Sequence, residues 1–411
     1  MAREEIITGL DIGSTKMCAT IAVRDNGGDP RVVGWAAGKS EGIRRGMVID
    51  MEAVIESVRK ILLEVQASAG CNIERVVVSV SGGHIQGMNS RGVIAVSRNG
   101  DEITRRDVNR VVEAAGTMAI PTDRQVLHVI KQEFALDDQR GIRDPVGMSG
   151  IRLEAEVHLI TGSVSSLKNL EKSINLAGVE VEDLILDSLA DSYSVLSNDE
   201  KELGAALVDI GGDVSGLALF TGGSLRHSGV LLVGGCHVTN DIAIVQRMSV
   251  PEAEAVKIRE GRALHSEPVT PGDPETPVSL FHRHTESEYT LTSVIQSRME
   301  ELFEMVKGEF ERTPHFETIP AGIVLTGGGA KLGEIAKLAE SIFERPTRIG
   351  IPRPLEGMDE KLSDPAYATV LGLILYSCDR KVNRRANHRN GSGLLGEIVN
   401  WFKVFRGDVV P

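Results

Sequence analysis

The chain contains 411 residues, of which 41% are hydrophobic and 25% are charged, and its formal net charge is −13. This length is enough for two or three domains, and the composition is ordinary for a globular protein, which excludes a disordered or fibrous chain. Because the net charge is strongly negative, no domain-wide basic field is available to displace phosphate counterions. We therefore expect no nucleic-acid partner.

The cysteines and the apolar stretches indicate in which cellular compartment the protein resides. The four cysteines lie far apart and predict reduced thiols instead of a disulfide frame or a zinc site: Cys18, Cys71, Cys236 and Cys378. The N-terminal residues are acidic and do not resemble a signal peptide. The longest apolar stretch, 366–376, is about half of the ~20 residues that span a bilayer. These features predict a cytoplasmic protein unless another segment ties it to a surface.

Short apolar runs alternate with segments of helical periodicity, which predicts an α/β architecture. The predicted strands are 6–12, 17–23, 32–39, 75–81, 125–136, 152–160 and 323–325. The predicted helices are 50–69, 103–118, 291–312, 333–343 and 366–378. Residues 84–162 differ from their surroundings because they contain a polar, basic helical segment and two strand-like stretches, and we interpret them as an inserted subdomain. Two polar stretches, 261–287 and 381–392, predict a loop and a linker.

Two segments that are 198 positions apart share one pattern: a strand that ends in Asp-Ile-Gly, a turn of small residues and a second strand. The first includes Asp11–Lys16 and the second Asp209–Ser215. Glycine lets backbone N–H groups approach phosphate oxygens, and turn hydroxyls add donors. A strand-end aspartate suits a water-mediated Mg²⁺ contact. One such turn alone would indicate only a tight hairpin, but two matching turns predict a phosphate site. A third glycine cluster, Gly327–Gly329, lies between a strand and a helix, and no P-loop pattern occurs.

These motifs resemble those of the actin-like ATPase superfamily, whose five motif regions can be placed in order. The resemblance implies an α/β, actin-like (ribonuclease H-like) two-domain fold with a cleft for ATP and Mg²⁺. The phosphate-binding residues that it implies are Gly13, Ser14, Thr15, Lys16, Gly211 and Gly212. Further cofactor contacts, including those to adenosine, are implied for Gly234, Gly235, Glu254, Lys257, Gly327, Gly328 and Gly329. Asp11, Asp209 and Asp187 would organise Mg²⁺ through water, and Asp187 would also position the attacking water.

Within the superfamily the chain resembles the FtsA family of bacterial cell-division proteins, which tether FtsZ to the membrane. The supporting motifs are 42–50, 232–235 and 237–241, together with the C-terminal segment. The resemblance implies polymerisation into protofilaments on the cytoplasmic side of the inner membrane at the division site. It also implies recognition of the FtsZ C-terminal peptide, and recruitment of later divisome proteins through the inserted subdomain.

The same resemblance implies a division of the chain into subdomains. Subdomain 1A takes 1–83, 163–196 and 355–380, and the inserted subdomain 1C takes 84–162. Subdomain 2A takes 197–235 and 309–354, with subdomain 2B at 236–308. A flexible basic linker at 381–392 and an amphipathic membrane-targeting helix at 393–406 follow.

Two departures from the family pattern concern hydrolysis. Relatives carry Glu or Gln where this chain has Asp187, whose carboxylate is one methylene shorter than that of Glu. In the second turn, Asp213 and Val214 replace a glycine and a threonine, which adds a carboxylate and removes a hydroxyl donor beside phosphate. We therefore expect ATP binding with at most weak ATPase activity. Two alternatives stay open, a pilus-assembly or chaperone-like actin homologue and a small-molecule kinase of the same superfamily.

The last helical segment is amphipathic. At 100° per residue, seven large apolar side chains fall on one face: Leu394, Leu395, Ile398, Val399, Trp401, Phe402 and Phe405. Residues 380–406 carry seven Lys or Arg, including Lys403 and Arg406, and one acid, so this segment is net +6. Basic residues near an anionic leaflet each contribute ~1 kcal/mol. The pattern predicts a membrane-binding helix, and the alternative is a helix that docks on the protein itself or on another protein.

A partner surface is predicted on the helix at 291–312. Arg298 falls within the apolar face of this helix, and a guanidinium there needs a carboxylate or carbonyl partner. One interpretation is an internal ion pair. The other is that Arg298 receives an acidic amphipathic peptide, and the resemblance points to the FtsZ tail.

Overall fold

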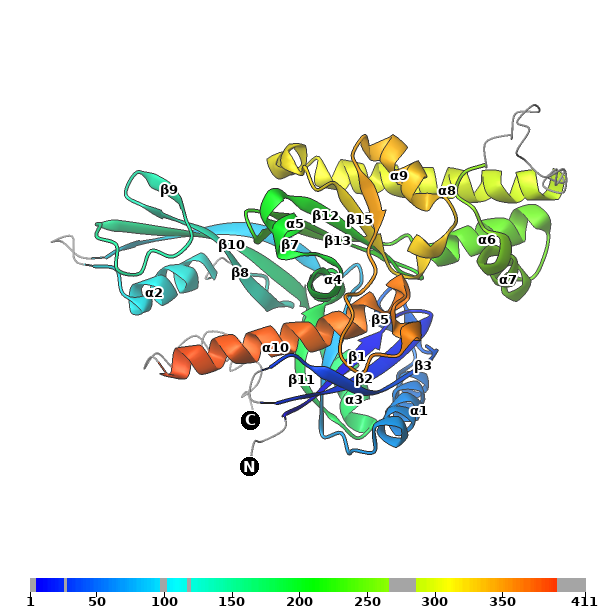
Figure 1. Cartoon of the computed structure of the whole chain (residues 1–411), viewed down its shortest axis with the longest axis horizontal. Helices are drawn as coiled ribbons and strands as arrows, with labels where there is room; N and C mark the ends of the chain where they lie inside the picture. The colour runs from blue at the N-terminus through cyan, green and yellow to red at the C-terminus, as the bar shows by residue number, and fades with distance from the viewer. Residues whose placement is uncertain (1–4, 26–27, 97–101, 117–119, 266–285, 390–411) are drawn as a thin grey trace.

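Two five-stranded sheets form the cores of two lobes, and a four-stranded sheet forms the core of a third unit. The computed structural model describes residues 5–25, 28–96, 102–116, 120–265 and 286–389. The third unit lies to one side of both lobes, and the helices α4 (Asp187–Val195) and α10 (Ala368–Arg389) lie between the lobes (Figure 1). This arrangement confirms the predicted actin-like α/β fold class.

The first lobe is built on a sheet of order β11-β6-β1-β2-β3. Its strands are β1 (Glu5–Ile12), β2 (Lys16–Arg24), β3 (Arg31–Lys39), β6 (Arg75–Val80) and β11 (Glu180–Leu186), and its helices include α1 (Met51–Ala69) and α3 (Val164–Leu176). Helix α1 begins where the side chain of Asp50 accepts the N–H groups of Glu52 and Ala53, and it ends at Gly70 with φ of 66°. The predicted helix 50–69 is therefore confirmed.

The second lobe repeats the local topology of the first. Its sheet has the order β14-β13-β12-β15-β16, and the elements are β12 (Ala205–Ile210), β13 (Ser215–Thr221), β14 (Ser224–Leu231), β15 (Ile323–Thr326), β16 (Thr347–Ile349), α5 (Asn198–Leu203), α6 (Gly235–Gln246), α7 (Val250–Glu260), α8 (Glu286–Phe310) and α9 (Ile335–Phe343). Strand β12 pairs antiparallel with β13 and parallel with β15, as β1 pairs antiparallel with β2 and parallel with β6. The repeat seen in the sequence is thus a repeat of structure.

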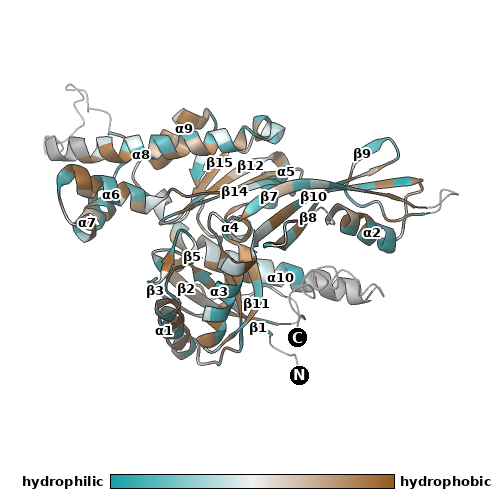
Figure 2. Ribbon diagram, turned by 180° about the vertical axis from the view of Figure 1, so that it is seen from behind, coloured by the Kyte–Doolittle hydropathy of each residue, from teal (hydrophilic) through white to brown (hydrophobic). Residues whose placement is uncertain are grey.

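The third unit has its own sheet and its own apolar core. Its elements are β7 (Gln86–Ala95), α2 (Arg105–Gly116), β8 (Arg124–Leu136), β9 (Gln139–Ile142) and β10 (Arg152–Ser163), with the sheet order β7-β10-β8-β9. Buried Val111, Phe134 and Leu153 belong to a hydrophobic cluster separate from those of the two lobes. In Figure 2 the apolar side of α2 faces this sheet. The segment is a folded unit, as the sequence predicted.

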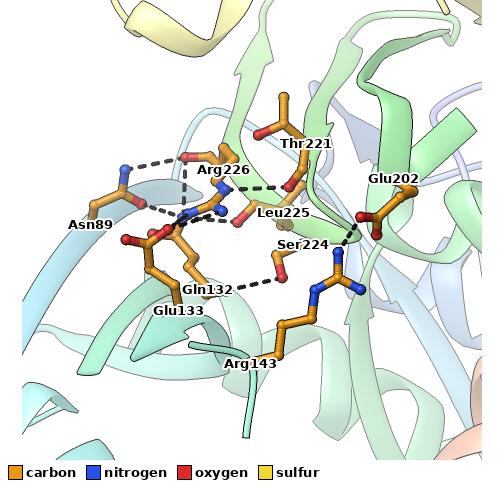
Figure 3. Close-up of polar contacts among 9 residues, drawn as sticks. All are labelled: Asn89, Gln132, Glu133, Arg143, Glu202, Thr221, Ser224, Leu225 and Arg226. Carbon is orange, nitrogen blue, oxygen red and sulfur yellow. Dashed lines mark hydrogen bonds and ion pairs between the residues drawn. The ribbon is translucent and has the colours of Figure 1, made fainter. Parts of the chain in front are cut away.

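A polar network joins this unit to strand β14 of the second lobe (Figure 3). Gln132 donates from Nε2 to the carbonyl oxygen of Leu225 at 2.8 Å and to Oδ1 of Asn89 at 3.1 Å. Asn89 in turn donates to the carbonyl of Arg226 at 3.2 Å. Because β14 is the edge strand of its sheet, these amide groups satisfy carbonyls that a further strand would otherwise pair.

One predicted element differs in length. The sequence predicted a helix ending at Cys378 and a flexible linker over 381–392, but α10 continues through Arg389. The prediction was wrong for 381–389 because these residues contain no Gly or Pro, so a helix anchored in the core can propagate through them. In the described part of the chain, no helix combines the length and hydropathy that crossing a membrane requires.

Candidate functional site

A cavity of about 390 Å³ lies where the two lobes meet, and both repeated turns line it. Its walls come from the strand ends of β1, β6 and β12, from the start of α4, and from α6 and α7. Because the carboxyl ends of parallel strands meet at one edge of a sheet, such an edge is a common place for ligands in α/β proteins. The cavity volume falls within the range of small-molecule sites.

The two turns have the same backbone geometry. The N–H of Gly13 donates to the carbonyl of Lys16 at 3.0 Å, and the N–H of Gly211 donates to the carbonyl of Val214 at 3.0 Å. A Cβ added at Gly13 would lie 2.9 Å from the Lys16 oxygen, and one at Gly211 would lie 2.8 Å from the Val214 oxygen. Glycine is therefore required at both positions, and each turn leaves backbone groups open to the cavity.

Lys16 connects the first turn to η5 (Pro365–Tyr367), the short 3-10 helix that immediately precedes α10. Its Nζ donates to the carbonyl of Ala366, lies 3.4 Å from Oδ2 of Asp11 and is 4.4 Å from the ring centre of Tyr367. Burial alone would lower the pKa of Lys16, but attraction by nearby groups, led by Asp11, gives a net rise. Lys16 is therefore a permanent cation at the wall of the cavity.

The second turn is supported from behind by the start of α6. The N–H groups of Gly235 and Cys236 donate to the carbonyls of Gly211 and Gly212 at 2.9 and 2.8 Å. A Cβ added at Gly234 would lie 2.6 Å from both of those carbonyl oxygens. The structure thus places Gly234 behind the turn and outside the cavity lining, although the sequence had predicted a cofactor contact.

Asp213 also differs from the expectation. The sequence analysis placed its carboxylate beside phosphate, whereas the structure directs Oδ2 to the backbone N–H of Arg45 at 3.0 Å. Asp213 does not line the cavity. The carboxylate therefore joins the second turn to the hairpin of β4 (Ile43–Arg44) and β5 (Met47–Val48) in the first lobe.

Glu254 and Lys257 lie together on α7 at the opposite wall. Lys257 Nζ donates to Glu254 Oε2 at 2.7 Å, to Thr239 Oγ1 at 2.8 Å and to the carbonyl of Gly235 at 3.0 Å. Gly327–Gly329 line the same cavity, and Gly327 has φ of 82°, with the Asp209 carboxylate where a Cβ would be. The structure brings the two predicted groups together.

Four carboxyl groups gather beneath the cavity. Burial, followed by repulsion from Asp187 and Asp11, raises the pKa of Asp209 well above its usual value. Burial also raises the pKa of Asp187 to about 6. On α4, one turn beyond Asp187, Asp191 has a pKa raised in the same way. A bound cation would offset this repulsion. In the described ranges, no group of three or more His, Cys, Asp or Glu side chains is arranged to ligate a metal directly.

Two buried hydroxyls in the cavity lining have no hydrogen-bond partner, Ser14 Oγ and Ser81 Oγ. An unsatisfied buried hydroxyl costs about 1–3 kcal/mol, so two of them in one cavity favour a polar ligand. Together with Lys16 and the two glycine turns, these donors fit the oxygens of a polyphosphate. The residues present therefore fit a magnesium nucleotide.

Apart from Gly234, every residue predicted to bind the cofactor or metal lines this one cavity: Asp11, Gly13, Ser14, Thr15, Lys16, Asp187, Asp209, Gly211, Gly212, Gly235, Glu254, Lys257, Gly327, Gly328 and Gly329. The sequence analysis missed other lining residues, among them Ser79, Ser81, Ile258 and Leu332. The two serines could have been found, because Ser79 lies near the end of β6 and Ser81 directly follows it, and the C-terminal end of this buried strand reaches the edge that holds Asp11. Ile258 and Leu332 carry no such local signal.

A second site lies on α6 and α8, in a shallow groove of about 430 Å³ that includes Arg298. Nε of Arg298 donates to Asp241 Oδ2 at 2.5 Å and Nη2 to Oδ1 at 3.1 Å, and Nη1 also donates to Glu301. The internal ion pair is thus confirmed. The groove also exposes the apolar side chains of Ile244 and Val245, which are 75% and 50% accessible. The predicted membrane helix at 393–406 lies outside the described residues.

Solved structures share the fold at low sequence identity. The chain resembles a protein of a PilM–PilN type IV pilus biogenesis complex with a TM-score of 0.64 and 19% identity, over 90% of this chain and 98% of the other. It also resembles MreB5 of Spiroplasma citri bound to ADP, with a TM-score of 0.54 and 16% identity, over 93% and 98% of the two chains. These likenesses establish the actin-like fold.

Family models and curated relatives are more specific. The family model for the SHS2 domain inserted in FtsA matches residues 82–161, and the model for the cell division protein FtsA matches residues 206–372. The chain is 40% identical to the cell division protein FtsA of Pseudomonas aeruginosa over 94% of its length and 93% of the relative. It is 37% identical to FtsA of Escherichia coli over 97% and 96%. The chain therefore belongs to the FtsA family of actin-like cell-division proteins.

Proposed function

We propose that this protein binds Mg-ATP between its lobes, polymerises on the inner face of the cytoplasmic membrane at the division site, and tethers FtsZ filaments there. The observation that carries the proposal is the single cavity in which both Asp-Ile-Gly turns, Lys16 and Gly327–Gly329 converge. Bound Mg²⁺ would neutralise phosphate charge, with Asp11, Asp187 and Asp209 holding its water ligands. FtsA of P. aeruginosa and E. coli, by their names, are cell-division proteins.

Nucleotide binding is tested by titrating a fluorescent ATP analogue with Mg²⁺ into the full chain. Lys16→Ala removes a half-buried cation from the phosphate turn, and we expect affinity to fall about tenfold or more. Lys168→Ala is the matched control, because Lys168 is exposed on α3 outside the cavity. Equal affinity in the two variants would contradict the proposed site.

Membrane attachment is assigned to 393–406. The proposal rests on the apolar face and the basic charge of this segment in the sequence. A single helix would bind anionic lipid reversibly, and many helices on one polymer would bind tightly through effective concentration. We expect the full chain to pellet with anionic vesicles in Mg-ATP and a chain ending at Asn390 to stay in solution. Trp401→Glu on the apolar face should abolish pelleting, whereas Asn400→Glu on the polar face should not; pelleting by both chains would contradict the assignment.

The groove on α6 and α8 is the proposed site for the FtsZ C-terminal peptide. Exposed Ile244 and Val245 provide an apolar floor, and Arg298 lies at its edge with one-quarter of its side chain accessible. Because Asp241 already neutralises Arg298 in part, we expect a modest contribution of roughly 1 kcal/mol from the guanidinium. Val245→Glu should therefore weaken peptide binding more than Arg298→Ala, and Arg259→Ala on α7, outside the groove, should leave it unchanged. Peptide binding unaffected by Val245→Glu would refute this location.

Polymerisation and recruitment complete the proposal. Membership of the FtsA family supports self-association into protofilaments, which electron microscopy of the protein on lipid would show directly. Later divisome proteins would bind the inserted unit, because it projects beside both lobes and has its own core. We expect slow ATP turnover, since Asp187 supplies a shorter carboxylate than the glutamate that the resemblance led us to expect.

A further inference from the structure

A hairpin of the first lobe reaches the phosphate turn of the second lobe. Its strands β4 and β5 pair Arg44 with Met47, so Arg45 and Gly46 form a two-residue loop. Both loop residues have positive φ, 51° for Arg45 and 74° for Gly46, which is the pattern of a type I′ turn. Glycine suits this conformation, but an arginine there is strained, because its Cβ disfavours the left-handed region. Such strain persists only where surrounding contacts hold the backbone in place.

The loop is packed against the end of β6 in its own lobe. A Cβ added at Gly46 would clash with the carbonyl oxygen of Ser81, and one at Gly82 would lie 2.8 Å from the carbonyl oxygen of Arg45. The two backbone segments therefore meet with no space for a side chain between them. This packing fixes the direction in which the backbone N–H of Arg45 points.

The N–H of Arg45 donates to the second lobe. The first residue of a two-residue hairpin loop forms no ladder bond with the opposite strand, and here the acceptor is Oδ2 of Asp213 at 3.0 Å. Next to this bond, a Cβ added at Gly212 would lie 2.6 Å from Cγ2 of Thr15. Gly46, Thr15 and Gly212 line the nucleotide cavity, whereas Asp213 does not. The Asp213 bond therefore joins the two lobes at the rim of the cavity without occupying it.

The internal repeat shows that this contact is a special use of position 213. Asp213 lies 198 positions after Thr15, which is its equivalent in the first turn. Thr15 lines the cavity, but Asp213 directs its carboxylate away from it and to the other lobe. The glycine of the family pattern would offer Arg45 no side-chain acceptor at this position.

We propose that Asp213 is a latch between the lobes, which holds the second turn against the β4–β5 hairpin and slows the release of nucleotide from the cavity. This inference rests on the proposed nucleotide site. A nucleotide in the cavity lies between the lobes, so it leaves as the second turn moves away from the hairpin, and this movement breaks the Asp213 bond. A charged acceptor strengthens a hydrogen bond, but this bond lies at a partly exposed rim, so its effect on release is about three- to tenfold.

The bond itself is tested by hydrogen exchange of the Arg45 amide in the full chain without nucleotide. We expect Asp213→Ala to accelerate this exchange about three- to tenfold. Asp213→Asn keeps an oxygen acceptor and should stay closer to wild type. The Ile49 amide is the internal control, because it donates to the carbonyl of Gly42 at 2.8 Å within the first lobe. Arg45→Asn removes the positive charge but keeps the N–H, and Asn tolerates positive φ, so the amide at position 45 should remain protected.

The consequence for nucleotide is tested by stopped-flow release of a fluorescent ADP analogue in Mg²⁺ from the same proteins. We expect release from Asp213→Ala to be about three- to tenfold faster than from wild type, with Asp213→Asn close to wild type. A carboxylate that repelled phosphate would have the opposite effect, because its removal would slow release. Slower or unchanged release from Asp213→Ala therefore overturns the latch.

The two measurements separate this inference from the proposed function. If the wild-type protein binds no ADP analogue, the proposed nucleotide site fails, and the role of Asp213 in release fails with it. If the analogue binds but exchange of the Arg45 amide is the same in wild type and Asp213→Ala, the nucleotide site stands and the latch is overturned. Faster exchange at Ile49 in Asp213→Ala would assign the effect to general loosening of the hairpin and would also overturn the latch.

Discussion

The junction between the inserted unit and the second lobe offers a quantitative test, and Gln132 is its central side chain (Figure 3). Gln132 is 9% exposed and donates to the Leu225 carbonyl at 2.8 Å. Gln132→Ala leaves this carbonyl of edge strand β14 without its side-chain donor in a place that water barely reaches. We expect a local cost of about 2 kcal/mol, the middle of the range for an unsatisfied buried polar group. This corresponds to roughly a 30-fold change in a local opening equilibrium.

Native-state hydrogen exchange of the β14 amides measures this opening directly, because exchange from a locally opened state reports its free energy. Arg143→Ala is the matched control in the same junction. It breaks the Arg143–Glu202 pair, whose side chains are 74% and 45% exposed, so solvent screens the interaction. We expect about a threefold change or less. Equal acceleration of exchange in the two variants would refute the argument that hydrogen bonds from buried side-chain amides, and not the peripheral ion pair, hold the inserted unit against β14.

Two further predictions concern stability. Burial lowers the pKa of His128 and of His158 to about 3, below the unfolded value of about 6.5. Between these two values the unfolded chain binds more protons than the folded chain, so the stability present above pH 6.5 is lost as pH falls towards 3. The free energy of unfolding then falls by up to ~1.4 kcal/mol per pH unit for each histidine. Thermal unfolding between pH 5 and 7.5 should show this slope, and His158→Asn should reduce it; an unchanged slope would exclude His158 as a source. Gly372→Ala on α10 would place a Cβ against the Ala190 carbonyl of α4 and should lower stability by about 1–3 kcal/mol. Gly308→Ala on α8 is its control, since nothing lies within 4 Å of an added Cβ there, and a larger loss in that variant would contradict the packing argument.

Much of the candidate site could be predicted because its signals are local. Each Asp-Ile-Gly turn is specified by six or seven consecutive residues, and both turns form the same hydrogen bond from a glycine N–H to a backbone carbonyl three residues later. Glu254 and Lys257 are three residues apart on one helix, so helical geometry alone brings them together. The conformation of such segments depends on neighbours in sequence, and a repeated pattern in the two halves of the chain indicated a shared ligand.

The sequence by itself thus determined the repeat, the alternating elements, the inserted unit and the amphipathic character of 393–406, because periodicity and turn chemistry act over short distances. Only the tertiary structure decided how separate strands use their polar groups. It directed the Asp213 carboxylate to the backbone N–H of Arg45, placed Gly234 behind the second turn, and brought Ser81 and Asp187 to one cavity from the ends of adjacent strands. These contacts join residues that are tens to hundreds of positions apart in the sequence. They form only when distant segments pack together, so local propensities do not predict them.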